Sequence, residues 1–339
     1  RPRRSAAGPP PPRPPAGGLK PGGPEGLIRF VLRRLLATLV IVLCVASVVF
    51  FAMRLIPADP AEVVLGDHAT AESLAAFRRS AGLDRPLGEQ YRDFLAGLIV
   101  ADLGRSLISN TSVGQQILEV LPYTISLAFA ALLVGATLGI PLGVATAVWR
   151  GRWLDLAGRV FALLGFSLPA FYLGVVLLLV FSVWLGWFPV VHSMRGEGVG
   201  EHLQKLVLPA LTLGIIQAAY ITRLTRSTML ETLRQDYIRT AFAKGLGSGR
   251  VYFVHALRNV MVPVVTAIGL YTGAVLGGAI LTETVFSRPG LGKLLVGAIA
   301  QRDYNLIQGG LITFAVLIAG INLLVDLSYA LIDPRVKHG

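Results

Sequence analysis

Six long apolar runs limit what this chain can fold into more than any other feature of the sequence. They cover residues 35–53, 125–148, 160–188, 206–221, 260–281 and 306–332. A helix needs about 17–25 apolar residues to cross the hydrocarbon core of a bilayer, and all of these runs approach that length. The third run carries Pro169 and the fourth Pro209, so a kinked or re-entrant helix is expected at both. The pattern predicts an all-α polytopic membrane protein with six transmembrane helices.

Composition and charge support a membrane protein and argue against other classes. With 54% hydrophobic residues and a mean hydropathy of +0.66, the 339 residues hold more apolar surface than a soluble core needs. The formal net charge of +12 does not indicate nucleic-acid binding, because the basic residues are spread over loops and are not interleaved with stacking aromatics. The single cysteine, Cys44, lies in an apolar run, so no intrachain disulfide is possible.

The distribution of charged residues predicts the orientation of the chain in the membrane. With the N-terminus in the cytoplasm, Arg152, the basic segment 223–258 and Lys337 all lie on the cytoplasmic side. The opposite side receives residues 57–121, which contain nine acidic residues and five arginines. We therefore expect both termini in the cytoplasm.

The N-terminal part divides into a tail and a first span. Residues 1–26 are rich in proline, glycine and arginine and have little to bury, so we expect a disordered cytoplasmic tail. Residues 27–56 are expected to form the first transmembrane helix. Because this run is long and no convincing small-residue cleavage site precedes Arg54, we expect it to be retained rather than removed as a signal peptide.

The connection between the first two spans is too long for a simple loop. Residues 57–121 are expected to form an external subdomain with helices at 71–79 and 87–99, separated by turn residues. Residues 122–339 then form a core with the remaining five spans and a cytoplasmic loop at 223–259.

The longest basic segment between two apolar runs, residues 237–263, is predicted to form a helix, a glycine turn and a second helix. Its first helix has an apolar stripe made of Leu233, Tyr237, Ile238, Ala241 and Phe242. The other face carries the basic residues Arg234, Arg239 and Lys244. The first helix should end at Gly245. Gly245, Gly247 and Gly249 offer positive φ for a tight reversal, and Ser248 is expected to cap a second helix near Arg250.

The residues of this hairpin carry a family resemblance. They are the run Arg239, Thr240, Ala241, Phe242, Ala243, Lys244, Gly245 and Leu246, followed by His255-Ala256-Leu257-Arg258-Asn259 and Pro263. The segment resembles the cytoplasmic EAA coupling loop of ABC importer permeases, in the form found in the dipeptide/oligopeptide/nickel permease family. Many such permeases have Glu at the head of the motif where this chain has Thr240, so the resemblance does not extend to a salt bridge from that position.

Other segments extend the resemblance along the chain. They include Gly82-Leu83-Asp84-Arg85-Pro86-Leu87 and Asp102-Leu103-Gly104-Arg105-Ser106 in the external loop, and Glu283-Thr284-Val285-Phe286-Ser287-Arg288-Pro289-Gly290-Leu291-Gly292 and Asp333-Pro334-Arg335 near the end. The match runs from about residue 27 to residue 337 in the expected order and is similar to a B-type subunit of that family.

The resemblance implies a fold, a function and partners. The fold would be that of a type I ABC importer permease, with a long helical external loop between spans 1 and 2. The chain would be a non-catalytic subunit in the bacterial inner membrane that forms half of a path for peptides or related small solutes. Its partners would be a homologous second permease, two cytoplasmic ATPase subunits that hold ATP and Mg²⁺, an external solute-binding protein and the lipid bilayer. No cofactor or metal is expected in this chain itself.

The same resemblance assigns roles to individual residues. Those expected to couple to the ATPase are Arg239, Thr240, Ala241, Lys244, Gly245 and Leu246. Glycines four residues apart predict close helix packing in the second span (Gly135, Gly139 and Gly143) and in the fifth (Gly269, Gly273 and Gly277). The fifth-span glycines are also pathway candidates, together with the gate candidates Phe286, Pro289 and Gly290.

Asp326 is the ionisable residue that stands out within an apolar run. An unpaired carboxylate in the membrane is costly, so Asp326 is a candidate functional residue. The alternative is a structural pair with an arginine such as Arg223 or Arg258. A proton-coupled carrier would be expected to carry several such groups along a path, and this sequence does not.

Motifs for catalysis are absent from the sequence, and one alternative function stays open. Residues 287–294 do not form a phosphate-binding loop, because Ser287 replaces its first glycine and Leu294 its Mg²⁺-binding Ser or Thr. The five histidines lack the spacing of a zinc site. The alternative is an autonomous secondary transporter or channel, for which inverted repeats or broken, charged helices would be expected. Dipeptides, oligopeptides, nickel chelates and glutathione all remain possible substrates.

Overall fold

A computed structural model of the chain describes residues 24–55, 60–66, 69–189 and 198–332. Within these residues the chain is helical, and the single extended pairing is an isolated bridge between Arg105 and Ser112. The long helices are α1 (Pro24–Leu55), α5 (Val113–Val148), α8 (Val199–Thr232), α11 (Leu257–Val285) and α13 (Tyr304–Ile332). The predicted all-α class is confirmed. Most of the predicted tail 1–26 lies outside the described residues.

Shorter helices connect the long ones. They are α2 (Pro60–Leu65), α3 (Ala71–Ser80), α4 (Leu87–Ile99), α6 (Trp153–Ser167), α7 (Ala170–Leu178), the π-helical turn η1 (Leu179–Trp184), α9 (Asp236–Ala243), α10 (Ser248–Arg250), the π-helical turn η2 (Val251–Ala256) and α12 (Leu291–Gln301). Helices α3 and α4 agree with those predicted at 71–79 and 87–99 to within one residue. The Thr70 hydroxyl caps α3 by accepting a hydrogen bond from the Ser73 backbone N–H.

The membrane-spanning helices correspond to the predicted apolar runs. Five helices are long and apolar enough to cross a membrane, and a bent pair, α6 with α7 and η1, supplies a sixth crossing if it counts as one span. The two halves of the pair meet at 105°. Leu168, which precedes Pro169, is extended with ψ of 125°, as expected for a residue before proline. The break predicted at Pro169 is therefore confirmed.

The tryptophans indicate that this bent pair crosses the membrane once. All four tryptophans of the chain flank it, and each is exposed. Trp149 follows α5 just before the pair and Trp153 begins α6, whereas Trp184 ends η1 and Trp187 lies just after it. Tryptophan is enriched at both membrane–water interfaces, so two pairs at opposite ends of one segment fit a complete crossing better than a loop that returns to the same side.

Helix α8 differs from its prediction. The apolar run predicted residues 206–221, whereas α8 covers Val199–Thr232 and continues through Pro209. Polar residues near its start, such as Glu201 and Lys205, hide its beginning from a search for apolar residues. A proline inside a helix removes one backbone hydrogen bond, but α8 packs along α5, and this packing holds it in one piece. The re-entrant form predicted as one alternative at Pro209 is wrong, because α8 is one continuous span there.

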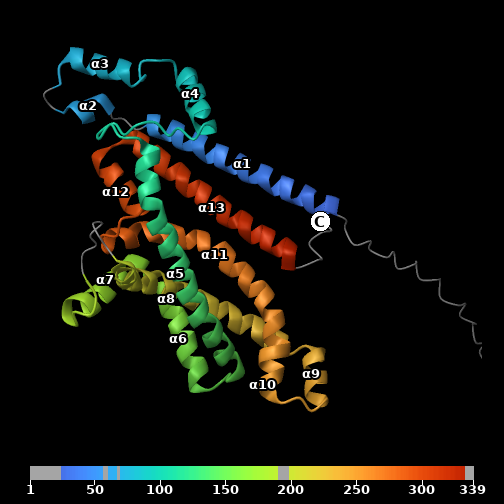
Figure 1. Ribbon diagram of the computed structural model, residues 1–339. Helices are drawn as coiled ribbons and strands as arrows, with labels where there is room; N and C mark the ends of the chain where they lie inside the picture. Colours follow the sequence, from blue (N-terminus) through green and yellow to red (C-terminus); the bar gives the residue numbers. More distant parts are fainter. Residues whose placement is uncertain (1–23, 56–59, 67–68, 190–197, 333–339) are drawn as a thin grey trace, which may run out of the picture.

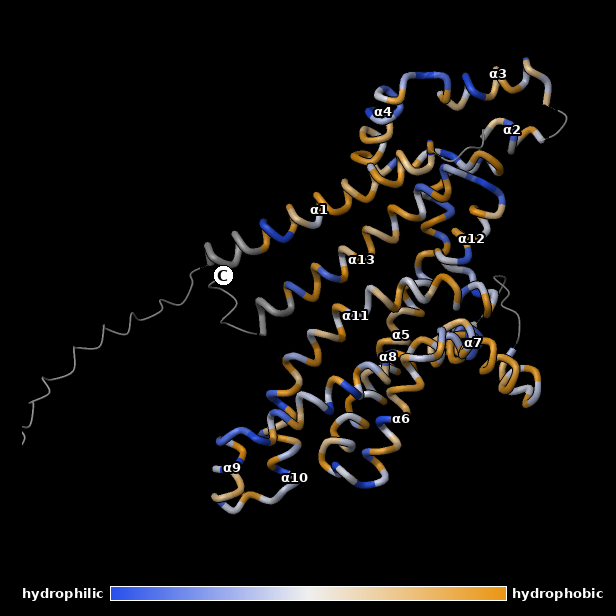
Figure 2. The backbone as a smooth tube through the Cα atoms, turned by 180° about the vertical axis from the view of Figure 1, so that it is seen from behind, coloured by the Kyte–Doolittle hydropathy of each residue, from blue (hydrophilic) through white to orange (hydrophobic). Residues whose placement is uncertain are grey.

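Figure 1 shows how the helices are arranged. Helices α3 and α4 lie at one end of the molecule, and α9 and α10 lie at the opposite end. Helices α5 and α11 run between the two ends, whereas α1 and α13 start near the α3–α4 end and run together obliquely to one side. In Figure 2 the hydrophobic residues follow these long helices, whereas hydrophilic residues gather around α4 and α9. The arrangement is that of a membrane-crossing body with a different small helical unit at each end.

Helices α5 and α8 are packed together through glycines. A Cβ atom on Gly135 would lie 2.9 Å from Gln217, and one on Gly139 would lie 2.7 Å from Ile221. Farther along, one on Gly143 would lie 2.5 Å from Thr225. Real Cβ atoms do not come this close, so the two backbones approach in a way that only glycine permits. The close packing predicted for the second span is confirmed.

Helix α1 holds α4 through aromatic and polar contacts. The Phe50 ring stacks on Phe94 of α4 at a centroid distance of 5.1 Å and lies 5.2 Å from the Tyr91 ring. Arg54 lies over Phe50 and donates a 3.0 Å hydrogen bond to the Gln90 side chain. Helix α4, in the connection between the first two spans, is therefore fixed to α1.

Candidate coupling hairpin and membrane groove

The predicted hairpin is present, and Gly245 makes its turn. Helix α9 ends at Ala243, and Gly245 follows with φ of +78°, which favours glycine. Its N–H donates to the carbonyl of Phe242 at 2.9 Å. Three details of the prediction are wrong: Gly249 lies within α10 without a positive φ, and the other two concern Gly247 and Ser248. Gly247 has φ of −63° and is itself the N-cap residue of α10, so Ser248 is the first residue of that helix and not its cap.

The apolar stripe of α9 divides between core and surface. Ile238 and Ala241 are buried in a cluster with residues of α5, α8, η2 and α11. Tyr237 and Phe242, predicted on the same stripe, are 43% and 41% exposed. One side of the stripe therefore anchors α9 in the body of the protein, and the other leaves two rings accessible at its surface.

The predicted coupling residues divide in the same way. Ala241 is buried in the cluster formed by α5, α8, η2 and α11, and Leu246 packs half-buried against it. Both residues therefore anchor the hairpin to these helices. The other four are exposed: Arg239, Thr240, Lys244 and Gly245. The Thr240 hydroxyl donates to the carbonyl of Asp236 at 2.9 Å. Thr240 therefore stabilises its own helix and does not take the place of an acidic residue.

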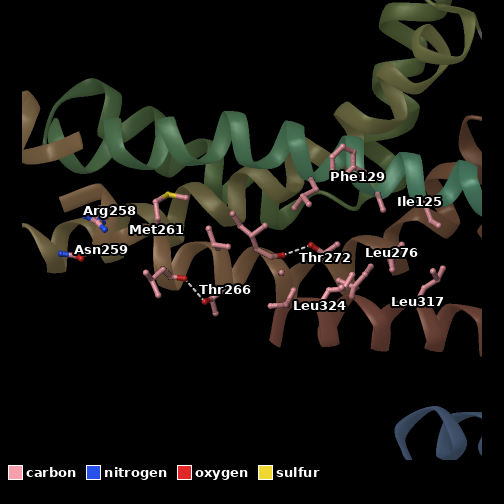
Figure 3. Close-up of a pocket in the computed structure, with 18 residues that line it drawn as sticks. Ile125, Phe129, Arg258, Asn259, Met261, Thr266, Thr272, Leu276, Leu317 and Leu324 are labelled. Atoms are coloured by element: carbon pink, nitrogen blue, oxygen red, sulfur yellow. Dashed lines mark hydrogen bonds between the residues drawn. The ribbon is translucent and has the colours of Figure 1, made fainter. Parts of the chain in front are cut away.

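A groove of about 840 Å³ lies between α5, α11 and α13. Figure 3 shows its lining, which is mostly aliphatic. Its polar side chains are Arg258 and Asn259 at one end, and Thr266 and Thr272 farther along α11. Both threonine hydroxyls donate to carbonyls of their own helix, at 2.8 Å each. Such a surface offers few directed contacts to a solute.

The predicted pathway glycines occupy different places on α11. Gly269 lines the groove, and a Cβ atom there would overlap Val325 of α13. A Cβ atom on Gly273 would lie 3.4 Å from Ile318 of α13. A Cβ atom on Gly277 would meet nothing within 4 Å. Gly269 therefore packs tightly against α13, Gly273 makes an ordinary contact with it, and Gly277 faces open space.

The gate candidates lie outside the groove, in the turn between α11 and α12. Phe286 is buried, and its ring lies 3.2 Å from where a Cβ atom of Gly174 on α7 would be. Gly290 is the N-cap residue of α12, and a side chain there would overlap the carboxylate of Glu283. Pro289 is half-buried in the same turn. The structure brings these residues together around α12.

Glu283 is a functional candidate that the sequence reasoning did not single out. Its side chain is fully buried, and its carboxylate accepts hydrogen bonds from the Thr124 hydroxyl at 2.7 Å and from the Gly292 N–H at 2.7 Å. It therefore joins α5, α11 and the first turn of α12. An acidic residue at the end of an apolar run was the signal that could have found it.

Two further buried carboxylates were also missed. Asp303 accepts hydrogen bonds from the Ser106 hydroxyl and, at 3.1 Å, from the Leu107 N–H, which ties the α12–α13 turn to the external loop. Asp155 of α6 forms an ion pair with Arg226 of α8, with Oδ1 and Nε 2.8 Å apart. Both pairs join segments far apart in the sequence, so no local pattern reveals them.

Asp326 has a partner that the sequence reasoning did not name. Its carboxylate lies 2.7 Å from Nη1 of Arg34 on α1. The arginines proposed as partners are elsewhere: Arg223 lies over the Phe166 ring at 4.6 Å, and Arg258 lines the groove. The predicted structural pair with an arginine is therefore present, but the arginine is Arg34 and neither of the two suggested. The ion pair with Arg34 holds α1 against α13.

The sequence matches two family models that together extend over most of the chain. Residues 139–338 match the model described as binding-protein-dependent transport system inner membrane component. Residues 27–128 match the N-terminal model for the membrane components of such systems. The first match alone covers more than half of the chain.

Curated relatives agree with these matches. The di/tripeptide transport system permease protein DppB of Pseudomonas aeruginosa is 40% identical over 334 residues, covering 92% of this chain and 99% of the relative. The glutathione transport system permease protein GsiC of Salmonella typhi is 40% identical over 312 residues, covering 92% and 100%. The dipeptide transport system permease protein DppB of Alkalihalophilus pseudofirmus is 38% identical over 333 residues, again covering 92% and 100%. The chain therefore belongs to the family of binding-protein-dependent transport system inner membrane components, the ABC importer permeases that its hairpin and outer loop resemble.

Proposed function

We propose that this permease subunit imports short peptides, powered by cytoplasmic ATPase subunits that bind the α9–α10 hairpin. The relatives described above carry names that refer to dipeptides, di- and tripeptides, and glutathione, which is itself a tripeptide. These names favour short peptides over a nickel chelate. The observation that carries the coupling role is the hairpin itself, with Phe242 and Lys244 exposed on a helix anchored by buried Ile238.

The groove supports the role of half a path. It is long and mostly aliphatic, and Gly269 and Thr272 of α11 line it. Because the groove lies on the side of one subunit, a homologous second permease is needed to enclose a solute. Few directed contacts in the lining also fit a route that releases peptides of different sequence, while an external binding protein selects them.

The proposed function also assigns each end of the chain to one side of the membrane and ATP hydrolysis to the partner subunits. The hairpin end lies in the cytoplasm of a bacterial cell, in contact with two ATPase subunits that hold ATP and Mg²⁺. Helices α3 and α4, at the opposite end, face the external binding protein (Figure 1). Both termini then lie on the cytoplasmic side of the inner membrane. This chain forms half of the solute path and moves with the ATPase subunits that bind its hairpin, and those subunits hydrolyse ATP.

One feature found in autonomous carriers is present, but the charge nearby is a cation, Arg223 of α8 over the Phe166 ring at 4.6 Å, which does not favour binding of Na⁺ or H⁺. The break between α6 and α7 is a discontinuous helix. No ionisable residue lies at residues 165–170, which form the break and its flanks. This favours a bent structural span over an ion-binding site.

Two variants of the hairpin test the proposal. Gly245→Pro removes the N–H that bonds Phe242 and cannot adopt φ of +78°, so it should release the ATPase subunits from the purified complex. Gly247→Ala is the matched control, because Gly247 has an ordinary φ and open space around it. Co-purification followed by mass spectrometry of subunits and bound solute is the measurement. Equal ATPase recovery in both variants, or a bound solute that is not a peptide, would contradict the proposal.

A further inference from the structure

We propose that the hydrogen bond between Asn259 and Tyr237 makes the coupling helix α9 and the end of the groove move as one body. Asn259 would then be a positioning residue that carries ATPase-driven movement of the hairpin to the path. This inference rests on the proposed function, because it assigns a purpose to a contact between the two candidate sites.

The contact joins the two sites directly. Nδ2 of Asn259 donates to the Tyr237 hydroxyl at 2.8 Å. Tyr237 is the second residue of α9, and Asn259 lies in the first turn of α11, where it lines the groove beside Arg258. Within the described part of the chain, it is the single side-chain hydrogen bond from α9 to another element.

The chain between these two residues contains a weak point. It passes through Gly245, through the three residues of α10 and then through the π-helical turn η2. A π-helical turn is rare and is a common place for a helix to deform. Without a second connection, α9 could shift relative to α11 by a change in η2 alone. The bond from Asn259 to Tyr237 spans this turn and supplies that connection.

Apolar packing alone does not define how α9 sits on α11. Ile238 and Ala241 share a buried cluster with Val260 and Ile268 of α11, and Ile268 also lines the groove. Hydrophobic contact is non-directional, so it holds the helices together while tolerating a sliding movement. A hydrogen bond at fixed distance and angle sets one register. The buried cluster therefore holds α9 against α11, and the Asn259–Tyr237 bond fixes where α9 lies along α11.

The variants separate this bond from general packing. Tyr237→Phe removes the acceptor and keeps the ring, and Asn259→Leu removes the donor with little change in size. Tyr252→Phe is the matched control, because Tyr252 lies in η2 against Phe242 and no hydrogen bond to its hydroxyl is found among the described residues. The double variant Tyr237→Phe with Asn259→Leu tests whether the two residues act through one contact.

The measurement uses the complex with its companion permease, ATPase subunits and binding protein in liposomes. Uptake of radiolabelled trialanine per ATP hydrolysed should fall about two- to threefold in each single variant, the lower end of the range for one lost hydrogen bond, because this contact is exposed to solvent. The double variant should be no worse than either single variant, and Tyr252→Phe should match the wild type. A wild-type ratio in Tyr237→Phe, or losses that multiply in the double variant, would overturn the inference.

A second readout separates this inference from the proposed substrate. Stimulation of ATP hydrolysis by the binding protein, loaded with whatever solute co-purifies with it, does not depend on trialanine. If the wild-type complex ignores trialanine, the peptide assignment fails. The inference would still hold if Tyr237→Phe and Asn259→Leu reduce the stimulation to the same extent and Tyr252→Phe does not. Equal stimulation in all variants would reject it.

Discussion

The hydroxyl of Thr124 donates a 2.7 Å hydrogen bond to the carboxylate of Glu283 and accepts one of 2.8 Å from the Leu291 N–H. One threonine in α5 thus holds both the end of α11 and the start of α12. All of these groups are buried. The motif of residues 283–292 is therefore a folded unit in which Glu283 bonds the backbone of Gly292, and glycine at 290 leaves room for the carboxylate.

Thr124→Val should destabilise the protein clearly. It leaves a buried carboxylate oxygen without its donor and a buried N–H without its acceptor, which costs about 2–4 kcal/mol in total. The matched control is Thr284→Val, because the one hydrogen bond of the Thr284 hydroxyl among the described residues goes to the carbonyl of Ile280 in its own helix. Thermal unfolding of each purified variant in detergent is the measurement. Equal shifts in melting temperature would mean that the link between α5 and α12 is unimportant.

Glycine substitutions should differ sharply by position. Gly143→Ala places a methyl group against Thr225 of α8 and should cost about 1–3 kcal/mol as an overpacked contact. Gly277→Ala meets no neighbour within 4 Å and should leave stability unchanged or slightly improved, since alanine favours a helix. The yield of folded protein after heating distinguishes the two. Comparable losses would show that the α5–α8 contact is looser than described.

Removal of either side of the Arg34–Asp326 pair should have unequal effects. The Asp326 side chain is 17% exposed and the Arg34 side chain 49% exposed. Arg34→Leu therefore leaves the more buried charge without this partner, and should reduce membrane insertion or stability more than Asp326→Asn does. The amount of protein in the membrane fraction and its melting temperature are the measurements. A greater loss for Asp326→Asn would favour a functional role for that carboxylate.

Cysteine labelling tests the orientation. In a Cys44→Ser background, Ser80→Cys at the end of α3 should react with a membrane-impermeant thiol reagent in whole cells. Ser248→Cys in the hairpin should react only after the cells are opened. Both positions are exposed, so access and not burial decides the result. The reverse pattern would place the hairpin outside and exclude contact with a cytoplasmic ATPase.

Local patterns in the sequence predicted the local features well. The lengths of the apolar runs predicted the spans, the turn residues between α3 and α4 separated these two helices, and Gly245 marked the end of α9 because a positive φ is needed there. The start of α8 was missed because polar residues precede its apolar part. The break at Pro169 and the continuous helix at Pro209 look alike in sequence, and the tertiary packing around each proline decides between them.

Long-range polar contacts were the part that the sequence did not reveal. Asp326 was recognised as unusual, but its partner Arg34 lies almost three hundred residues away and was not proposed. Glu283 lies within a motif that was quoted for its resemblance, yet its bond to Thr124 depends on how α5 passes α11. Similarly, the groove needs three helices to be placed before its lining can be named. Periodicity shows which face of a helix is apolar, and does not show which helix covers it.

The most direct test of the account is uptake of labelled trialanine by the purified complex in sealed liposomes, measured with and without ATP. The account predicts uptake that requires ATP, the ATPase subunits and the binding protein together, and that is lost when Gly245→Pro disrupts the hairpin. Uptake by this chain alone, driven by an ion gradient without ATP, would contradict it and would show an autonomous carrier.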